Sequence, residues 1–362
     1  MSTSTSIRAI EIARLDIPLH TPFGISGGAQ AMANNVLFTV VLADGTRGFG
    51  EAAPLPPYNG ETQADAIAAL ESARGWVTGR DARSWRDCAA EFRQRRSLRS
   101  GSAQCAFETA LLDALTRHDH VPLWRYFGGN GTVLETDMTV TTGTASQAGQ
   151  DARTIRARGI RMIKVKVGGP AGAAHDLERI AAILAEAPDA PLILDGNAGI
   201  NRGVAGELIR GLKQRGVRPA VLEQWLPKDD LAGMKALRDE SGWTVAADEA
   251  VTTRDDAMRV AAAGAAQLIN IKLMKDGIAT ALEIVEVARM NGLGLMIGGN
   301  VESILAMTTS ACFAAGTGGF DYADLDTPFF LAANPFDGGY ALNGGTISVS
   351  HITAGHGVRP RG

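Results

Sequence analysis

Six short apolar segments of this chain each end in a polar residue that can do chemistry, and the six residues recur at nearly even spacing. The first five are 29, 28, 25 and 24 residues apart, and the last follows after 52, which is two periods. One strand, one helix and two loops need about 30 residues, so the period predicts a repeated strand–helix unit. Polar residues at the C-terminal ends of successive strands are typical of a TIM-type barrel with its active site on that face. The six residues are Lys166, Asp195, Glu223, Asp248, Lys272 and Asp324.

The length and the irregular first third of the chain predict a second, smaller domain. A barrel takes about 250 residues, and this chain has 362. The first third shows no strand–helix rhythm, because a strand at Ile7–Pro18 and a hairpin around Asp44-Gly45 are followed by three helical stretches. Gly128–Gly131 reads as a linker. The expected parts are an α+β domain at 1–130, a barrel at 131–326 and a tail at 327–362.

Two strands and two loops near the domain boundaries carry further expectations. Leu134–Val140 follows the linker and should be the first barrel strand. Thr346–Val349 has no partner in the barrel count, so we expect it to return to the first domain. Pro18–Asn35 and Ala52–Glu61 are rich in Gly and Pro, which is typical of loops that cover an active site.

Composition excludes several classes of partner. The net charge is −4 and no basic stripe occurs, so no nucleic-acid partner is expected. No apolar run is long enough to span a membrane, and the N-terminus lacks the apolar core of a signal peptide. The three cysteines fit neither a disulfide framework nor a zinc site, which predicts reduced thiols and a cytoplasmic location. A small-molecule substrate remains, and a homo-oligomer is compatible with the sequence.

Three carboxylates are expected to bind a metal ion. Asp195, Glu223 and Asp248 end three successive strands, which are neighbours in a closed barrel. Acids that converge in this way cannot all stay ionised without a cation. Oxygen ligands with no Cys or His nearby select a hard ion, Mg²⁺ before Mn²⁺. The alternative is that each acid caps the helix that follows it, but three acids in register with two lysines favour metal ligands.

Lysines stand on both sides of these acids. Lys164 and Lys166 are two residues apart in one strand, so they should point the same way, about 6.6 Å apart. We expect both to face the barrel mouth and to lower each other's pKa, as a lysine base requires; the alternative is an edge strand with solvated lysines. Lys272 lies four strands further on, so a substrate held between Lys166 and Lys272 would present one face to each. Lys275 falls in a loop and is expected to be solvated.

At this point the chain resembles a known family, the enolase superfamily in its muconate-lactonizing enzyme subgroup. The resemblance implies an α/β fold, a modified (β/α)7β TIM barrel with an α+β capping domain built from both termini. It also implies Mg²⁺ on Asp195, Glu223 and Asp248, with Lys166 and Lys272 as an acid/base pair. The shared step is abstraction of a proton α to a carboxylate, with Mg²⁺ stabilising the enediolate and Lys164 neutralising the substrate carboxylate. The motifs, which span essentially the whole chain, are KVKVG, DGN, EQW, DE, NIKLMKDG, GGNVES and DLDTP.

Some positions depart from the pattern of this family. Gly196 and Trp225 stand where relatives often have the Ala of DAN and the Pro of EQP, and neither change touches a metal ligand. Gly298 and Asn300 belong to a Gly-Gly-Asn sequence in place of a more usual Cys/Gly-Met pair, which bears on side-chain preference. We take Gly298, Asn300 and Thr139, on the first barrel strand, as candidate substrate-binding residues.

The absence of a histidine and the presence of one pair of acids reduce the number of possible reactions. No histidine lies between His175 and His351, which excludes the histidine base of mandelate racemases and many acid-sugar dehydratases. Asp324 and Asp326 form a D-x-D pair that resembles dipeptide epimerases, where it binds the α-ammonium group; the alternative is a turn or helix cap. The resemblance therefore implies a Mg²⁺-dependent dipeptide epimerase. The alternatives are a muconate-type cycloisomerase, an N-acylamino acid racemase or an o-succinylbenzoate synthase, and, in a different class, a catalytically silent binding barrel.

The side chain of the substrate is expected to meet the capping domain. No Lys or Arg occurs between Arg14 and Arg47, whereas an epimerase of Ala-Glu would want a cation there for the glutamate. An uncharged or hydrophobic second residue is therefore favoured. Phe23 and Ile25 are candidates to line that pocket, and the alternative is that they pack the cap against the barrel.

Overall fold

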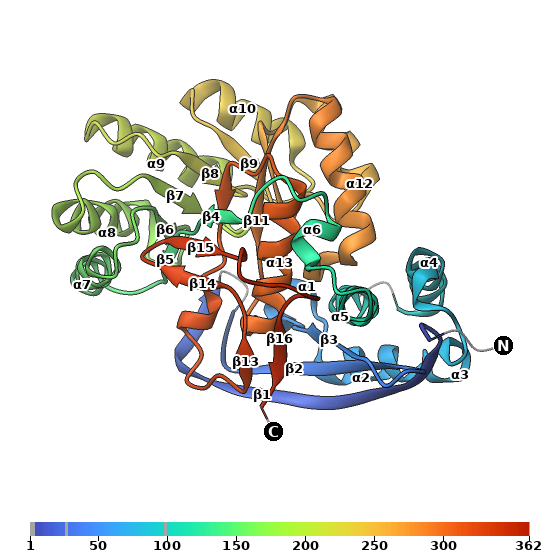
Figure 1. Ribbon diagram of the computed structural model, residues 1–362. Helices are drawn as coiled ribbons and strands as arrows, with labels where there is room; N and C mark the ends of the chain where they lie inside the picture. The colour runs from blue at the N-terminus through green and yellow to red at the C-terminus, as the bar shows by residue number, and fades with distance from the viewer. Residues whose placement is uncertain (1–3, 26–27, 98–99, 362) are drawn as a thin grey trace.

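The first domain is built on a long antiparallel sheet. A computed structural model describes residues 4–25, 28–97 and 100–361, without the side chains of residues 21–29. The elements of this domain are β1 (Ile7–Ile25), β2 (Gly28–Leu42), β3 (Arg47–Ala52), α1 (Pro56–Asn59), α2 (Gln63–Glu71), α3 (Arg74–Val77), α4 (Trp85–Arg95), α5 (Gly101–His118) and α6 (Leu123–Tyr126). The sheet order is β1-β2-β3, and Figure 1 shows this sheet along the foot of the molecule.

Helix α5 packs directly on β3, and glycine makes the contact close. A Cβ atom at Gly48 would lie 2.2 Å from the Ala114 nitrogen, and one at Gly50 would lie 2.0 Å from the Ala106 carbonyl oxygen. Both distances are far below van der Waals contact, so only glycine fits at these two positions. The alternating glycines of β3 thereby fix where the buried helix lies on the sheet.

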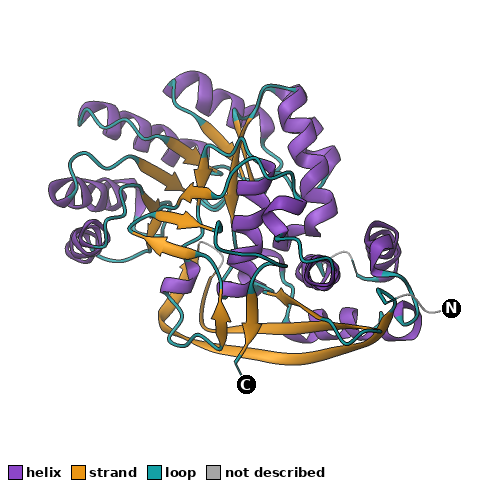
Figure 2. Ribbon diagram, viewed as in Figure 1, coloured by secondary structure: helices purple, strands orange, loops and turns teal. Residues whose placement is uncertain are grey.

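The second domain is a barrel of eight parallel strands, with seven helices between them in the described part of the chain. The strands are β5 (Met138–Val140), β6 (Ile163–Lys166), β7 (Leu192–Asp195), β8 (Val221–Glu223), β9 (Val245–Ala247), β10 (Leu268–Lys272), β11 (Gly294–Gly298) and β12 (Tyr322–Ala323). The helices are α7 (Ala145–Ala157), α8 (Gly172–Glu186), α9 (Arg202–Gln214), α10 (Leu231–Ser241), α11 (Arg254–Ala263), α12 (Gly277–Met290) and α13 (Ile304–Thr317). Each strand pairs with the next in the sequence, and a parallel bridge between Thr136 and Ala323 joins the last strand to the first. The predicted α/β fold, a modified (β/α)7β barrel with an α+β capping domain, is confirmed, and Figure 2 shows the helices outside the strands.

Local signals in the sequence explain why these helices begin where they do. The side chain of Asn201 accepts a hydrogen bond from the Val204 N–H at the start of α9. Thr253 and Asp256 form a reciprocal capping box at the start of α11. Such caps satisfy amide groups that have no partner inside the helix. Strands such as β7 and β10 are buried along their whole length, as apolar runs covered on both faces should be.

Two expectations about the first domain and the linker are wrong. Pro18–Asn35 is not a loop, because β1 continues to Ile25 and β2 starts at Gly28. A register shift between Pro18 and Phe23 lets the hairpin ladder continue past the proline, which has no N–H to donate. Leu134–Val140 is not one strand either: it is divided into β4 (Val133–Glu135) and β5, and only β5 belongs to the barrel sheet.

The tail forms two small sheets. Its strands are β13 (Phe336–Gly338), β14 (Ala341–Asn343), β15 (Thr346–Ser348) and β16 (Val358–Pro360). The strand predicted at Thr346–Val349 does not join the sheet of the first domain: β15 pairs with β14 and β4. Other parts of the tail do contact that domain, since the Ala332 N–H donates to the Pro18 carbonyl at 2.7 Å and His356 Nε2 lies 2.9 Å from the Phe49 carbonyl oxygen.

Two buried glutamates of the first domain hold the barrel. Glu51, at the end of β3, accepts hydrogen bonds from the N–H groups of Ser303 at 2.9 Å and Ala306 at 3.2 Å, at the start of α13. Glu108 of α5 accepts a hydrogen bond from the Ala279 N–H at 2.8 Å, at the start of α12. A helix N-terminus attracts anions because its first amides are unpaired. The first domain, which is the capping domain, therefore supplies side chains that cap the N-termini of two barrel helices.

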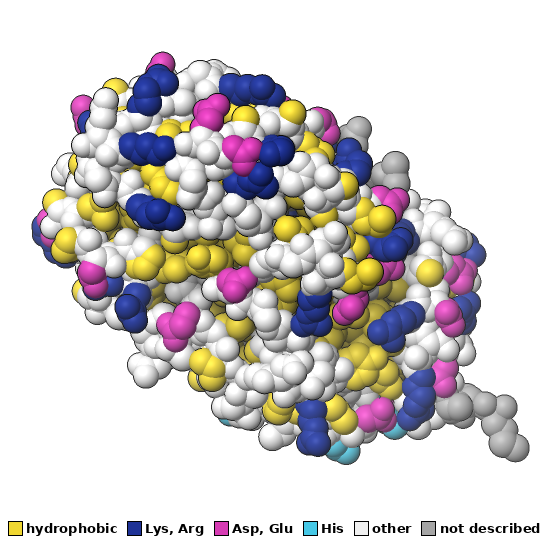
Figure 3. Space-filling model, turned by 90° about the horizontal axis from the view of Figure 1, so that it is seen from above, with side chains coloured by type: hydrophobic (Ala, Val, Ile, Leu, Met, Phe, Trp, Pro, Cys, Tyr) yellow, Lys and Arg dark blue, Asp and Glu magenta, His cyan; other side chains and the backbone are white. Residues whose placement is uncertain are grey.

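The surface carries charges of both signs. Figure 3 shows Lys and Arg side chains interspersed with Asp and Glu on the face seen from above, with no large area of one sign. This agrees with the small net charge of −4. None of the helices in the described ranges has the length and apolar character that crossing a bilayer requires.

Candidate active site

Lys164 and Lys166 face into the barrel from β6. The register pairs Lys164 with Thr139 of β5 and Lys166 with Asp195 of β7. Only 1% of Lys164 and 7% of Lys166 is exposed. Their Nζ atoms lie 3.0 Å and 2.7 Å from the same atom, Asp195 Oδ2. The two ammonium groups therefore point the same way, as the period of a strand predicts.

The three acids predicted to bind a metal stand at neighbouring strand ends. Asp195 and Glu223 are the last residues of β7 and β8 and lie opposite each other in the register, and Asp248 follows β9 directly. All three are fully buried. Lys164 Nζ lies 2.9 Å from Glu223 Oε2, and Lys272 Nζ lies 2.8 Å from Asp248 Oδ2. The lysines are thus the counter-ions of these acids.

The donor chemistry of these carboxylates suits a hard cation. Glu223 Oε2, Asp248 Oδ2 and Asp248 Oδ1 each face a lysine ammonium group, at 2.9, 2.8 and 2.7 Å. Buried carboxylates are costly unless cations compensate their charge. In the described structure Asp195, Glu223 and Asp248 do not bring one oxygen each within 4.8 Å of one another. A Mg²⁺ site is made from oxygens of this kind.

The acids also stabilise the protonated, positively charged form of Lys164. Burial lowers the pKa of Lys164, but Asp195, Asp324 and Glu223 outweigh burial and hold this pKa well above its usual range. The pKa of Lys164 is therefore raised and not lowered as the sequence analysis expects, because the acids dominate. Burial raises the pKa of Asp195, but Lys164 and Lys166 outweigh it and the pKa falls below its usual range. Burial and the charge of Asp195 raise the pKa of Glu223 to about 7.

Lys272 stands on the other side of the three acids. It ends β10, four strands along the sheet from β6, and 8% of it is exposed. Its Nζ lies 5.6 Å from the centre of the Tyr58 ring, which comes from α1 of the capping domain. A cation near an aromatic face is stabilised by the ring. Burial lowers the pKa of Lys272, but Asp248 outweighs burial and the pKa lies above its usual range. The site is thus built from both domains.

The prediction that Lys275 is solvated is wrong. Only 8% of Lys275 is exposed, and its Nζ lies 2.7 Å from Asp248 Oδ1. The same ammonium donates to the carbonyl oxygens of Asp248, Val251 and Asn270, at 2.7, 3.0 and 2.8 Å. A short 3-10 helix at Leu273–Lys275 turns the side chain inward after β10. Lys275 therefore holds the carboxylate of Asp248 in position.

Two buried amides that the sequence analysis missed orient the acids. Asn270 Nδ2 donates to Glu223 Oε1 at 2.8 Å, and Gln224 Oε1 accepts the N–H of Asp248 at 2.9 Å. Both amides belong to motifs that carry the family resemblance. Asn270 is two residues before Lys272, so the strand period places them on one face. That spacing was the signal that could have identified Asn270.

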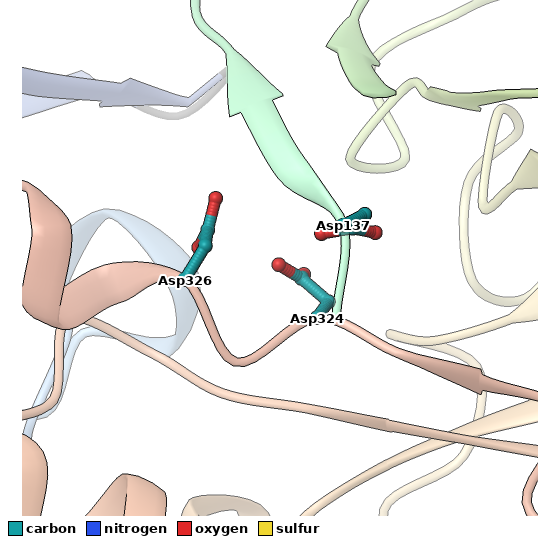
Figure 4. Close-up of side chains that lie close together, drawn as sticks. All are labelled: Asp137, Asp324 and Asp326. Carbon is teal, nitrogen blue, oxygen red and sulfur yellow. The ribbon is translucent and has the colours of Figure 1, made fainter. Parts of the chain in front are cut away.

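Asp324 and Asp326 meet groups of the first two barrel strands. Asp324 Oδ2 accepts a hydrogen bond from Lys164 Nζ at 2.7 Å, and Asp326 Oδ2 accepts one from the Thr139 N–H at 2.7 Å. With Asp137, just before β5, they are the only three acidic, His or Cys side chains of the described chain with ligand atoms all within 4.8 Å of one another (Figure 4). The sequence analysis missed Asp137, although it lies two residues before Thr139 and so faces the same way.

The other candidate substrate-binding residues have different surroundings. Gly298 ends β11, and a Cβ atom there would lie 2.9 Å from Asn270 Oδ1, so glycine leaves room for the amide that holds Glu223. Asn300 is buried, and its Nδ2 donates to the Ala53 carbonyl at 3.1 Å, which joins the barrel to the cap. Two further candidates have side chains outside the described part of the structure, namely Phe23 and Ile25.

The two departures from the family pattern lie side by side. Trp225 is fully buried, and its Nε1–H donates to the Leu194 carbonyl at 2.8 Å, which ties it to β7. A Cβ atom at Gly196 would lie 2.7 Å from Trp225 Cα. That distance is too short for any side chain without a backbone shift, so the backbone of Trp225 favours glycine directly after β7, next to Asp195.

A buried acid beside the site predicts a pH-dependent stability. Only 1% of Glu302 is exposed, and burial raises its pKa to about 8. Because the folded-state pKa is above the unfolded value of about 4.3, the folded state binds the proton more tightly, and the free energy of unfolding falls as pH rises from about 4 to about 8. Glu302→Gln should lose this dependence, so its stability relative to wild type should rise with pH across that window. The difference is on the order of a few kcal/mol.

Urea unfolding at several pH values would measure this difference, with the exposed Glu178→Gln as the matched control. A constant difference between Glu302→Gln and wild type at all pH values would contradict the assignment.

Comparisons with known proteins agree with this arrangement. Residues 7–128 match the family described as "Mandelate racemase / muconate lactonizing enzyme, N-terminal domain", and residues 147–362 match "Enolase C-terminal domain-like". An aromatic dipeptide epimerase of Herpetosiphon aurantiacus is 49% identical over 98% of this chain and 99% of its own. An L-Ala-D/L-Glu epimerase of Thermotoga maritima is 37% identical over 91% of this chain and 94% of its own. A crystal structure of a dipeptide epimerase from Enterococcus faecalis, complexed with Mg and the dipeptide L-Leu-L-Tyr, is 27% identical with a TM-score of 0.92, over 98% of this chain and 99% of that chain.

Proposed function

The chain belongs to the mandelate racemase/muconate lactonizing enzyme family of the enolase superfamily, and on this premise we propose that it inverts the α-carbon of a dipeptide by proton transfer between Lys166 and Lys272. It is an isomerase of the epimerase kind. The observation that carries the proposal is the position of the two lysines on β6 and β10, with three acid-bearing strand ends between them. One lysine removes the proton from one face of the carbon, and the other returns a proton to the opposite face.

We infer that Asp195, Glu223 and Asp248 would hold Mg²⁺. Their negative charges are buried, and in the described structure lysine ammonium groups are the main positive charges beside them. When bound, the ion supplies positive charge that stabilises the negative charge that develops on the substrate carboxylate as the α-proton leaves. Lys164, which is in contact with two of these acids, adds a further positive charge beside that carboxylate. The Mg-bound relative from Enterococcus faecalis supports the choice of ion.

The α-ammonium group of the substrate would bind at Asp324 and Asp326. Both acids are buried, so a cation that reaches them is poorly screened by water. A muconate-type cycloisomerase or an o-succinylbenzoate synthase acts on anions without an amine, which these acids would repel. The substrate of an N-acylamino acid racemase has no ammonium group for them to bind. The acids therefore favour a free dipeptide over those alternatives. Opposed lysines at the same site argue against a silent binding barrel.

A dipeptide with an uncharged or hydrophobic second residue is the favoured substrate. The segment between Arg14 and Arg47, which forms the β1–β2 hairpin, has no Lys or Arg to pair with an acidic side chain. The higher identity to the aromatic dipeptide epimerase than to the L-Ala-D/L-Glu epimerase supports the same choice. Incubation of a dipeptide library in D₂O, with mass spectrometry of α-deuterium incorporation, tests it. Preferred exchange into dipeptides with an acidic second residue would contradict it.

The acidic pair provides a sharper test of substrate class. Asp326→Asn should raise KM for free dipeptides by tens- to thousands-fold, since the loss of one partner of a desolvated charge pair costs roughly 2–5 kcal/mol. Asp337→Asn, an exposed acid of the tail, serves as the matched control and should leave KM unchanged. Wild-type enzyme should process N-acylated dipeptides poorly, because they lack the ammonium charge. Faster turnover of an N-succinyl amino acid or a muconate than of every free dipeptide would overturn the proposal.

A further inference from the structure

Asp137 is a buried acid that the proposed reaction does not use. It lies next to the bridge that closes the barrel, where its N–H donates to the Ala323 carbonyl at 3.0 Å. None of its surface is exposed. It faces Asp324 and Asp326, with one oxygen of each of the three acids within 4.8 Å of the others (Figure 4). Its position beside the two acids that are proposed to bind the ammonium group indicates a role that acts through these neighbours.

The hydrogen bonds of the three acids differ in one respect. Asp324 has a donor in Lys164 Nζ, and Asp326 has a donor in the Thr139 N–H, both at 2.7 Å. Neither oxygen of Asp137 accepts a hydrogen bond from any residue that the structure describes. A buried carboxylate without a donor is strongly unfavourable, and three acids this close cannot all be ionised. Asp137 is therefore the acid that keeps a proton.

We propose that Asp137 is a positioning residue: as a neutral carboxylic acid, it donates a hydrogen bond to the Asp324–Asp326 pair and fixes the two carboxylates that receive the ammonium group. The proposal deepens the proposed function and rests on it, because the pair matters only if a free amine binds there. Closely spaced carboxyl groups can share one proton, because their negative charges repel, and here one oxygen of each acid lies within 4.8 Å of the others. Burial, with the charges of Asp324 and Asp326, raises the pKa of Asp137 well above its usual range, in agreement with the geometry.

The neutral acid also explains how the site can prefer an ammonium group to a metal ion. Three ionised carboxylates would make a site for a divalent cation, since such ions prefer several charged oxygen ligands. With Asp137 neutral, two negative charges remain at Asp324 and Asp326, and Lys164, which Asp324 shares with Asp195 and Glu223, offsets them only in part. The net negative charge that is left suits a monovalent ammonium group.

The test compares two substitutions of Asp137. Asp137→Asn keeps a neutral side chain that can donate, so KM for a free dipeptide should stay within about threefold of wild type. Asp137→Ala removes the donor, so KM should rise about tenfold or more, with a smaller change in kcat. Glu135→Gln, an exposed acid of β4, is the matched control. A similar rise in KM for Asn and Ala would overturn the proposal, because it would mean that an ionised carboxylate is required, and so would an unchanged KM for Ala.

A second measurement does not depend on turnover. The infrared difference spectrum of wild type minus Asp137→Asn at neutral pH should contain the C=O stretch of a protonated carboxylic acid, and a spectrum without this band would overturn the proposal. If Asp137→Ala does not fold, Asp137→Asn and the infrared band still decide. A wild-type enzyme that epimerises no free dipeptide would contradict the proposed function, while the band would still report whether Asp137 carries the proton.

Discussion

Lys166→Ala and Lys272→Ala are each expected to abolish epimerisation while leaving exchange of the α-proton in one epimer only. The physical reason is that β6 and β10 are four strands apart, so in the proposed complex the two amines would lie on opposite sides of the bound carbon and the remaining lysine would reach one face. Loss of a general acid or base costs about 10²–10⁴-fold in rate, and inversion needs both. NMR in D₂O, started separately from each epimer of one dipeptide, would measure the exchange.

The two variants should exchange opposite epimers, which distinguishes a lost base from a general loss of fold. Lys235→Ala, on the exposed face of α10, is the matched control and should retain both activities. Exchange of both epimers at the wild-type rate in either variant would refute the two-lysine scheme.

Removal of the divalent metal is expected to stop the reaction, and loss of any one ligand should weaken its binding. Asp195→Asn, Glu223→Gln and Asp248→Asn each replace a charged oxygen ligand by a neutral amide. Changes to residues that merely support metal ligands cost about 10–100-fold in affinity, so changes to the ligands should cost at least as much. Calorimetric titration with Mg²⁺ would measure the affinity, with the exposed Asp229→Asn as control. Full activity in excess chelator would contradict the metal assignment.

The barrel and the positions of its polar strand ends were predictable because they depend on a period. Strand, helix and loops repeat at nearly constant length, and the last residue of each inner strand must face the barrel mouth. Asp195, Glu223 and Lys272 therefore occupy strand ends that the spacing alone indicates. Resemblance to a family added the reaction to this framework.

Features that depend on three-dimensional contacts were not predictable. Lys275 lies in a short turn that reads as exposed, and only the convergence of three carbonyl oxygens and Asp248 makes it a buried ion. Asp137 belongs to no motif, and only the closure of the barrel places it beside the last barrel strand, β12. Pairing of β15 with β4 joins segments more than two hundred residues apart, which no local pattern indicates.

The glutamates that join the cap to the barrel limit how the substrate can enter and leave. If the cap lifted away as one body, Glu51 and Glu108 would lose the helix N-termini that they cap. That movement would separate buried hydrogen-bonded carboxylates from their donors, so its free energy would approach that of partial unfolding. We therefore expect substrate entry and product release to depend on small displacements of local segments such as α1, which carries Tyr58 over Lys272. Product release would then be insensitive to substitutions at Glu51 and Glu108 that leave the fold intact.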